Sequence, residues 1–334
     1  MWDTASPRGR HSLVTSTGER RGLPETCGGM PGVPSVFLVY YAAAALAGLW
    51  VLLDGRTRLT HRPAWEVVFW ALGVAIPATL PIFLPMYLLG SRAPDRSGLW
   101  GPAEIIGIAI FFGLTLPLAA GLAGLRQDAL TLGAVSAVIL VQNAGFVLLS
   151  FLGIALRYHL PLERLGLTAR RFGSRLAAGL VAGALMVPVS AVTERAGVEA
   201  YALVRGREAA VRQAERERRM DPLNRVLEAT EGPAATAWLL VLLGVVVPIG
   251  EEVYFRGVVY GGLRNRYGRG WGLVGSTLFF GVVHRQVVHF LPIAVLGLVL
   301  ALLYERAGSL LPPIAVHAVN NVVSVLARIY GWEI

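Results

Sequence analysis

Lysine is absent from the 334-residue sequence, cysteine occurs once, and charged residues make up only 15% of the chain. The single Cys27 excludes an internal disulfide framework and gives no indication of an oxidising compartment. All 30 cationic residues are arginine. A net charge of +9 would suit a nucleic-acid-binding protein, but the arginines lie mostly between apolar runs, where flanking cations orient membrane proteins. We therefore expect no nucleic-acid partner.

The composition is that of a membrane protein. Hydrophobic residues make up 55% of the sequence, and its mean hydropathy is +0.59. A membrane-spanning helix needs ~20 mostly apolar residues, so the chain has room for roughly eight or nine of them. The sequence predicts an all-α, polytopic membrane helix bundle whose partner is the lipid bilayer. The apolar runs that would form the spans lie at 34–53, 65–90, 101–125, 129–156, 176–192, 234–262, 271–288, 290–304 and 310–330.

Four regions follow from the composition along the chain. Residues 1–33 are rich in arginine, glycine, serine and proline and contain no apolar run, which predicts a disordered tail. Residues 34–192 would form the N-terminal transmembrane helices. Residues 193–232 interrupt the apolar pattern as a charged, helical insertion, and residues 233–334 would form a C-terminal transmembrane core.

The placement of arginine predicts how the chain is oriented, because loops on the cytoplasmic side carry an excess of cations. With a cytoplasmic N-terminus and nine spans, the inside loops would carry the larger group: Arg92, Arg96, Arg157, Arg164, Arg170, Arg171, Arg175, Arg264, Arg266, Arg269 and Arg306. The outside loops would carry Arg56, Arg58, Arg62, Arg126 and Arg285. We expect a multi-pass protein of a bacterial cell membrane with its N-terminus in the cytoplasm.

The insertion at 193–232 contains eight arginines and eight acidic residues. Its run from Arg212 to Arg219 has the spacing of an exposed helix with i,i+4 ion pairs, and Pro222 is expected to end that helix. A substrate-docking element is the alternative interpretation. Residues 157–175 combine arginines with leucines, a pattern that fits either a segment at the lipid headgroups or a plain cytoplasmic loop.

Ionisable residues inside an apolar span are costly and mark functional sites, and this chain concentrates them in its last third. Glu251 and Glu252 directly follow the apolar run 238–250. On a helix, Glu252 and Arg256 lie four residues apart and can form an ion pair, which leaves Glu251 without a partner on its own helix. An unpaired buried carboxylate is suited to act as a general base. Alternatively, the two carboxylates mark the end of a span at the headgroups.

Three further polar residues end or interrupt later apolar runs. His284 closes one run, and His317 and Asn321 lie four residues apart on one face of the last helix. At 1.5 Å per residue, Glu251 lies ~16 Å and His284 ~20 Å from the inner ends expected for their spans. His317 and Asn321 lie ~10 to ~17 Å from theirs by the same rise. These four side chains can therefore occupy one layer of the bilayer.

Three motifs occur in order over this part of the chain. They are Glu251-Glu252-x-x-x-Arg256, Phe280-x-x-x-His284 and His317-x-x-x-Asn321. In this order and spacing they resemble the CPBP intramembrane glutamic endopeptidases, which include the type II CAAX prenyl endopeptidases and the bacteriocin-processing and immunity proteins. The resemblance covers residues 234–326.

The resemblance implies an intramembrane endopeptidase that hydrolyses a peptide bond of a membrane-associated protein or peptide. In that family's arrangement, a water molecule activated by Glu251 and His284 would attack the peptide carbonyl. His317 and Asn321 would donate hydrogen bonds to the developing oxyanion. The ion pair described above would orient the site without reacting.

Two alternatives stay open. Two histidines and a glutamate form a known catalytic zinc set, although Asn321 is a poor zinc ligand and a good oxyanion donor, which favours a site without a cofactor. The zinc ligands would be Glu251, His284 and His317. The other alternative is a membrane protein without turnover, such as a transporter, an immunity protein or a scaffold, although a degenerate member would be expected to lack Glu251 or His284.

Overall fold

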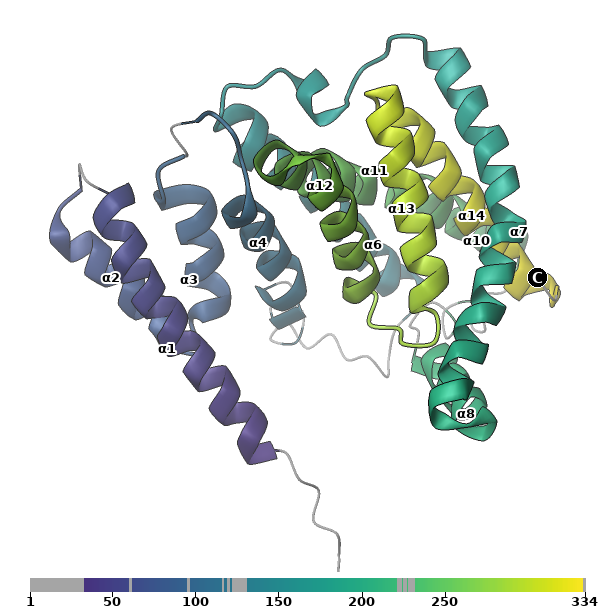
Figure 1. The fold of residues 1–334 in the computed structure, drawn as a ribbon, viewed down its shortest axis with the longest axis horizontal. Coiled ribbons are helices and arrows are strands. Elements are labelled where there is room, and N and C mark those ends of the chain that lie inside the picture. Colours follow the sequence, from purple (N-terminus) through teal and green to yellow (C-terminus); the bar gives the residue numbers. More distant parts are fainter. Residues whose placement is uncertain are drawn as a thin grey trace, which may run out of the picture.

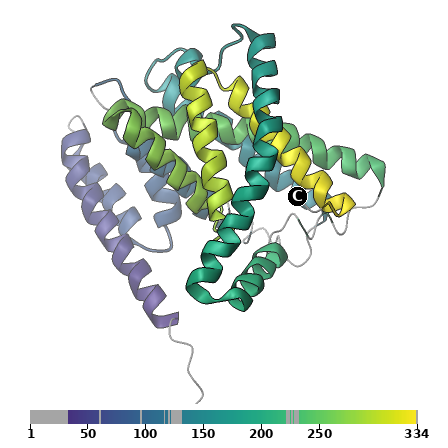
Figure 2. The ribbon, with the colours of Figure 1, turned by 45° about the vertical axis from the view of Figure 1, so that its right-hand side comes forward.

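The computed structural model describes residues 33–59, 62–94, 97–115, 117–118, 121, 131–220, 224, 227 and 232–332. Every regular element among these residues is a helix, which confirms the predicted all-α fold. The helices form one bundle, with α1 and α2 at one edge in both views and α7 at the opposite edge in Figure 1 (Figures 1 and 2).

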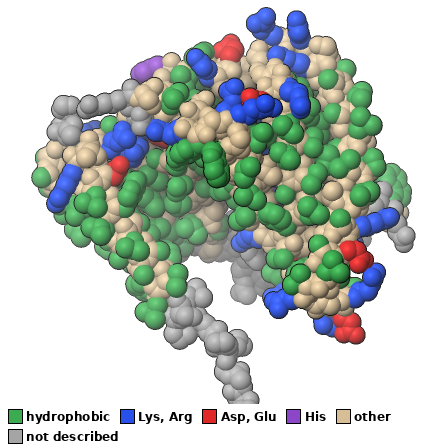
Figure 3. Space-filling model, viewed as in Figure 1, with side chains coloured by type: hydrophobic (Ala, Val, Ile, Leu, Met, Phe, Trp, Pro, Cys, Tyr) green, Lys and Arg blue, Asp and Glu red, His purple; other side chains and the backbone are tan. Residues whose placement is uncertain are grey.

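Five helical stretches in the described part of the chain are long and apolar enough to cross a membrane. Hydrophobic side chains cover the middle of the face seen in Figure 3, and arginines gather toward its upper end and around its lower right corner. This distribution is that of an integral membrane protein. The five stretches are Phe37–Arg58, Leu132–Leu156, Phe172–Arg205, Pro233–Val283 and Phe290–Ala307.

The single span predicted over residues 65–90 is wrong. The structure has two shorter helices there, α2 (Ala64–Ala75) and α3 (Leu80–Met86), and α3 continues as the π-helical η1 (Tyr87–Ser91). Pro77 disfavours helical geometry in the residue before it, and Ile76 is indeed extended, with φ −82° and ψ 117°. The chain therefore reverses inside the predicted span, and α2 packs against α1 (Val33–Arg58).

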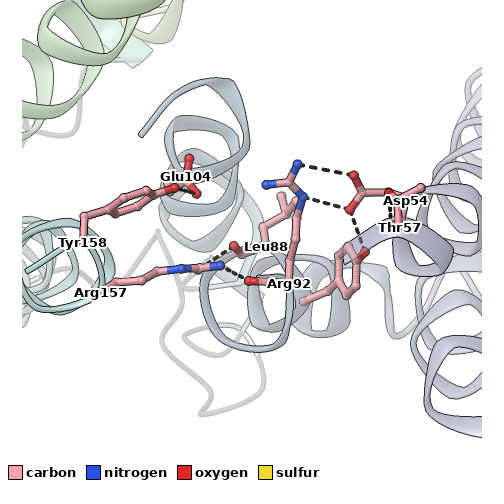
Figure 4. Close-up of polar contacts among 8 residues, drawn as sticks. Asp54, Thr57, Leu88, Arg92, Glu104, Arg157 and Tyr158 are labelled. Carbon is pink, nitrogen blue, oxygen red and sulfur yellow. Dashed lines mark hydrogen bonds and ion pairs between the residues drawn. The ribbon is translucent and has the colours of Figure 1, made fainter. Parts of the chain in front are cut away.

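This reversal places the end of α1 at the same face of the bundle as the end of η1. Asp54 of α1 accepts a 2.8 Å hydrogen bond from Nε of Arg92, and Arg157 donates to the backbone oxygen of Arg92 (Figure 4). The placement of arginine predicted that the 56–62 loop lies on the opposite side of the membrane from Arg92. That prediction is wrong because residues 65–90 do not form one span. Arg96 and Arg126 lie outside the described residues.

One long helical segment carries the Glu-Glu motif, and its winding changes several times. Inside α12, Gly268 has φ 84° and ψ 171°, values that glycine adopts readily, so residues 269–283 form a separate helix. Two stretches before it are π-helical, a local widening that is frequent at functional sites. In chain order the parts are α10 (Pro233–Val241), η6 (Leu242–Val246), α11 (Val247–Glu252), η7 (Val253–Tyr260) and α12 (Gly261–Val283).

The preceding helices hold this segment in place. Indole Nε1 of Trp100 donates to the backbone oxygen of Val258 at 2.9 Å, and the Tyr254 hydroxyl donates to that of Ile105 at 2.9 Å. Phe146 stacks on Tyr254, with ring centroids 4.8 Å apart. These buried contacts join η7 to the elements α4 (Pro102–Ile110), η2 (Phe111–Thr115), α6 (Leu132–Ser150) and η4 (Phe151–Leu156).

The last two helices complete the bundle. Gly308 ends α13 (Phe290–Ala307), and two prolines begin α14 (Leu311–Tyr330), an arrangement suited to a tight helix–helix turn. The turn is tied to residues 157–175, because Leu310 N–H donates to the Gly166 oxygen at 3.0 Å. The short 3₁₀ helix η5 (Leu162–Leu165) precedes Gly166, and its Leu165 is buried.

The charged region begins inside a helix. α7 (Phe172–Arg205) continues through residues 192 and 193 without interruption, and α8 (Arg207–Met220) folds back beneath its lower end (Figure 1). The predicted i,i+4 pairing is present in α8, where Arg212 lies 3.2 Å from Glu208. Pro222 lies outside the described residues.

Gly250, next to the Glu-Glu motif, provides a test of the packing between α11 and α6. A Cβ atom added there would lie 2.7 Å from Asn143 Cβ and 2.9 Å from its Cα, so α6 would have to move. Overpacking of this kind costs about 1–3 kcal/mol, and we expect Gly250→Ala to lower the midpoint of thermal unfolding in detergent.

The matched control is Gly270→Ala, at an exposed helical position with open space around it. Alanine favours a helix over glycine by about 1 kcal/mol, so this variant should unfold at or above the wild-type temperature. Equal midpoints for the two variants would contradict the close approach of α6 to α11.

Candidate active site

The carboxylate of Glu252 is the centre of the site. It is fully buried, and its Oε1 accepts 2.8 Å hydrogen bonds from Nη1 of Arg256 and from Nδ1 of His317. The predicted ion pair between Glu252 and Arg256 is thus present, four residues apart on one helix. His317 adds a contact from α14, so this carboxylate joins two helices that are distant in the sequence.

Arg256 is only 2% exposed, and it makes two further contacts. Its Nη2 donates to the backbone oxygen of Gly297 on α13 at 3.2 Å. Its guanidinium carbon lies 4.5 Å from the ring centroid of Phe280 on α12, a cation–π contact. The buried charge therefore has an anion, a carbonyl and an aromatic face around it, as burial of a cation requires.

Glu251 is the less satisfied of the two adjacent carboxylates. Its side chain is 15% exposed, and its Oε2 is buried without a hydrogen-bond partner among the described residues. This oxygen lies 3.9 Å from Nε2 of His317. Oε2 of Glu252 also has no partner, but the other oxygen of Glu252 carries two bonds. Glu251 thus presents a buried acceptor toward an imidazole nitrogen.

His284 lies at the end of α12, where its Nδ1 is 2.7 Å from the backbone oxygen of Phe280. A carbonyl only accepts hydrogen bonds, so Nδ1 carries the hydrogen and, in the neutral ring, Nε2 carries the lone pair. The Phe280 ring contacts His284 and lies edge-on to His317, with centroids 4.6 and 6.2 Å away. Within the described residues, no hydrogen bond or ion pair joins His284 to Glu251.

Asn321 is oriented by a carbonyl that the helix leaves free. Its Nδ2 donates to the Leu243 oxygen at 2.9 Å. In the π-helical η6, Val247 N–H bonds the oxygen five residues earlier, so the N–H of residue 248 would bond Leu243. Residue 248 is proline and has no N–H. Asn321 takes the vacant acceptor, and its second amide hydrogen stays available for another partner.

The side chains proposed as zinc ligands are not gathered around one point. Among the described residues, no three His, Cys, Asp or Glu side chains lie closely enough together to hold a metal ion. Nδ1 of His317 bonds Glu252 and Nδ1 of His284 bonds a backbone oxygen, contacts that leave Nε2 of each ring as the ligand atom. A zinc ion bound by Glu251, His284 and His317 would require these side chains to move closer together.

Sequence reasoning missed three contributors to the site. Phe280 was noted only as part of a motif, yet its ring touches both histidines and Arg256. Asn143 lies far from the motifs in the sequence, and its Oδ1 is buried, without a hydrogen-bond partner, against Gly250. Pro248 carried the clearest signal, because a proline inside an apolar helix always frees a carbonyl one turn earlier.

Comparison with known proteins finds relatives over the segment that carries these residues. Residues 233–323 match the family model described as type II CAAX prenyl endopeptidase Rce1-like. The chain is also 28% identical over 95 residues to the Bacillus subtilis protein named "Putative membrane peptidase YdiL". That alignment covers 28% of this chain and 39% of the relative. No solved structure matches the chain significantly.

The class of protein follows from the fold and the matched segment. The chain is a helical integral membrane protein, and the part that carries Glu251, His284, His317 and Asn321 is similar to membrane peptidases. Residues 233–323 are matched by the Rce1-like family, which confirms the resemblance indicated by the three motifs.

The buried ion pair yields a prediction about stability. Arg256→Met removes the cation and leaves the Glu252 carboxylate uncompensated, which costs about 3–5 kcal/mol when a buried pair is broken. A second substitution, Glu252→Gln, removes the stranded charge and keeps an oxygen for the His317 N–H. We expect the double variant to unfold at a higher temperature in detergent than Arg256→Met alone.

Arg212→Met is the control, because its ion pair with Glu208 is exposed and such pairs contribute about 0–1 kcal/mol. If adding Glu252→Gln lowered the midpoint of Arg256→Met further, the carboxylate would be stabilised by something other than the guanidinium.

Proposed function

We propose that this protein is an intramembrane endopeptidase that hydrolyses a peptide bond of a membrane-associated protein or peptide. The proposal rests on the observation that two adjacent glutamates differ in their hydrogen-bond partners. Glu252 is bound by Arg256 and His317, whereas Glu251 keeps a buried oxygen without a hydrogen-bond partner, 3.9 Å from His317 Nε2. A buried acceptor of this kind is ready to bind and deprotonate a water molecule.

The reaction needs a base, an electrophile and a donor for the leaving group. In this proposal, a water molecule between Glu251 and His284 gives its proton to this pair as its oxygen attacks the peptide carbonyl carbon. The tetrahedral intermediate collapses with cleavage of the C–N bond, and the same proton passes to the departing amine. The His284 tautomer supports this role, because Nδ1–H is fixed on Phe280 and Nε2 is left as the acceptor.

The oxyanion would be stabilised by His317 and Asn321. Asn321 has one amide hydrogen on the Leu243 oxygen and a second one to offer. Nδ1–H of His317 is already donated to Glu252, so His317 can donate through Nε2 only as an imidazolium. A positive His317 would also balance the charge of two glutamates against one arginine. This reasoning supports a mechanism without a metal ion.

Glu251→Gln tests the proposal most directly. The amide keeps the size of the side chain but cannot accept the proton of water, so we expect cleavage to be abolished. The substrate is sought by comparing the membrane proteomes of cells that express wild-type protein and Glu251→Gln, looking for a fragment formed only with the wild type. With that substrate, Asn321→Ala should lower kcat by about 10²- to 10³-fold, as loss of an oxyanion donor does.

Glu163→Gln is the matched control, since Glu163 is an exposed carboxylate of η5 that makes none of the contacts described for the site, and it should cleave normally. Wild-type cleavage should also persist after dialysis against a zinc chelator. Normal turnover by Glu251→Gln would end the catalytic proposal, and loss of turnover on chelation, restored by zinc, would replace it with a metal-dependent one.

We also propose an orientation in the membrane. Several contacts place arginines of distant loops at one face: Arg92 on Asp54, Arg264 on Glu305, and Arg175 on the Ala307 oxygen. By the excess of cations in cytoplasmic loops, this arginine-rich face lies in the cytoplasm. The start of α1 then lies on the opposite side, which differs from the cytoplasmic N-terminus expected from the sequence.

Labelling of single cysteines checks this orientation in a Cys27→Ser background. In right-side-out vesicles, a membrane-impermeant maleimide should react with Glu208→Cys on α8 and should reach Arg306→Cys only after permeabilisation. Both positions are exposed, so accessibility differs only by side. The reverse pattern would support the orientation predicted from the sequence.

A further inference from the structure

The turn of residues 284–289 begins at His284 and is contacted by α8. Three successive backbone N–H groups of this turn point to one carboxylate of α8, that of Glu217. Val287 N–H donates to Oε1 at 2.8 Å, Val288 N–H to Oε1 at 3.2 Å, and His289 N–H to Oε2 at 3.5 Å. A single side chain thus satisfies the backbone of half the turn.

The same carboxylate binds a side chain of the turn. Nδ1 of His289 lies 2.8 Å from Oε2 of Glu217, and Nε2 of His289 lies 3.4 Å from Glu194 on α7. Gln213, one turn earlier on α8, donates to Oε1 of Glu217 at 2.9 Å. Glu217 is only 8% exposed, whereas the side chains of His289 and Glu194 are 23% and 47% exposed, so the cluster is buried at its Glu217 end. We call Glu194, Glu217 and His289 the latch.

The histidine of the latch lies between two negatively charged groups. The hydrogen bonds to Glu194 and then to Glu217 raise the pKa of His289, despite partial burial, which favours the cationic form of its ring. Burial opposes the charge of Glu217, but bonds from Gln213, His289 and the turn keep its pKa below the usual value. The imidazolium therefore lies between two carboxylates that come from two different helices.

The position of the turn determines where His284 lies. Immediately after His284, Arg285 adopts φ 55°, a conformation that is unfavourable for a residue other than glycine and that surrounding contacts must maintain. Val288 is 1% exposed, and its backbone oxygen packs against Gly197 of α7. α7 on one side and Glu217 on the other therefore fix the path by which the chain leaves α12.

We propose that Glu217 is a positioning residue for the hydrolytic site, and that the latch holds the 284–289 turn so that the imidazole of His284 faces the water to be activated. The inference rests on the proposed function. It assigns a role to the charged insertion that its composition does not indicate. Glu217 differs in this respect from Glu208 of the same helix, which is 90% exposed and contacts only Arg212 within the described residues.

The test compares Glu217→Ala and Glu217→Gln with Glu208→Ala in the full-length protein. Hydrogen–deuterium exchange of the 285–290 segment reports on the latch without requiring activity. We expect exchange to be at least about tenfold faster in Glu217→Ala, intermediate in Glu217→Gln, which keeps one acceptor oxygen, and unchanged in Glu208→Ala. Tenfold corresponds to about 1.4 kcal/mol, the scale of hydrogen bonds to a charged group.

The positioning role of Glu217 is tested by measuring turnover and the ¹⁵N signal of the His284 ring. With a cleaved substrate, Glu217→Ala should lower kcat at least tenfold with KM unchanged, and Glu217→Gln should recover part of the loss. The chain has six histidines, so ¹⁵N-histidine labelling resolves the His284 ring, whose signal should shift in Glu217→Ala and stay in place in Glu208→Ala.

Each outcome supports or overturns the latch or the positioning role of Glu217. Unchanged exchange of the 285–290 segment in both Glu217 variants overturns the latch. Faster exchange with kcat and the His284 signal unaffected overturns the positioning role. If wild-type protein and Glu251→Gln are equally inactive on every substrate, the proposed function fails by itself, and the His284 signal alone then supports or overturns positioning by Glu217.

Discussion

The site depends on one buried carboxylate. Glu252 is fully buried, and it is tolerated there because Arg256 from its own helix and His317 from α14 both donate to it. Arg256 in turn requires the Gly297 oxygen on α13 and the Phe280 ring on α12. A charge buried in a medium of low polarity needs an opposite charge or a hydrogen bond at each polar atom. These four helices therefore have one arrangement in which both Glu252 and Arg256 are compensated.

This arrangement explains why two adjacent glutamates differ. Glu252 is committed to the framework and is unsuitable for proton transfer, because its protonation would remove the negative charge that compensates the buried Arg256. Glu251 lies on a different side of the same helix and supports no other helix through a hydrogen bond in the described residues. In the proposed mechanism, a reactive carboxylate therefore lies beside a structural one, and the two have separate roles.

Local rules predicted much of this. The i,i+4 spacing gave the pair of Glu252 with Arg256, and helix rise was compatible with bringing His317 to the same depth. The chain reversal at Ile76 was not predicted, although Pro77 indicated it, because hydropathy alone does not distinguish one long span from two short helices. The contacts of Glu217 could not be predicted, because its partners lie some 70 residues further along the chain and on a turn without periodicity.

Pro248 ties the assembly of the site to the last helix. Without Asn321, the Leu243 oxygen has no donor in the interior of the bundle, and without His317 the buried Glu252 loses one of its two bonds. Both donors belong to α14, the final helix of the described chain. During synthesis, the segment that carries the two glutamates enters the membrane before α14. These acceptors therefore stay unsatisfied until α14 has been inserted. The order of translation therefore delays completion of the site until α14 has joined the helices made before it, so the proposed mechanism cannot operate before that step.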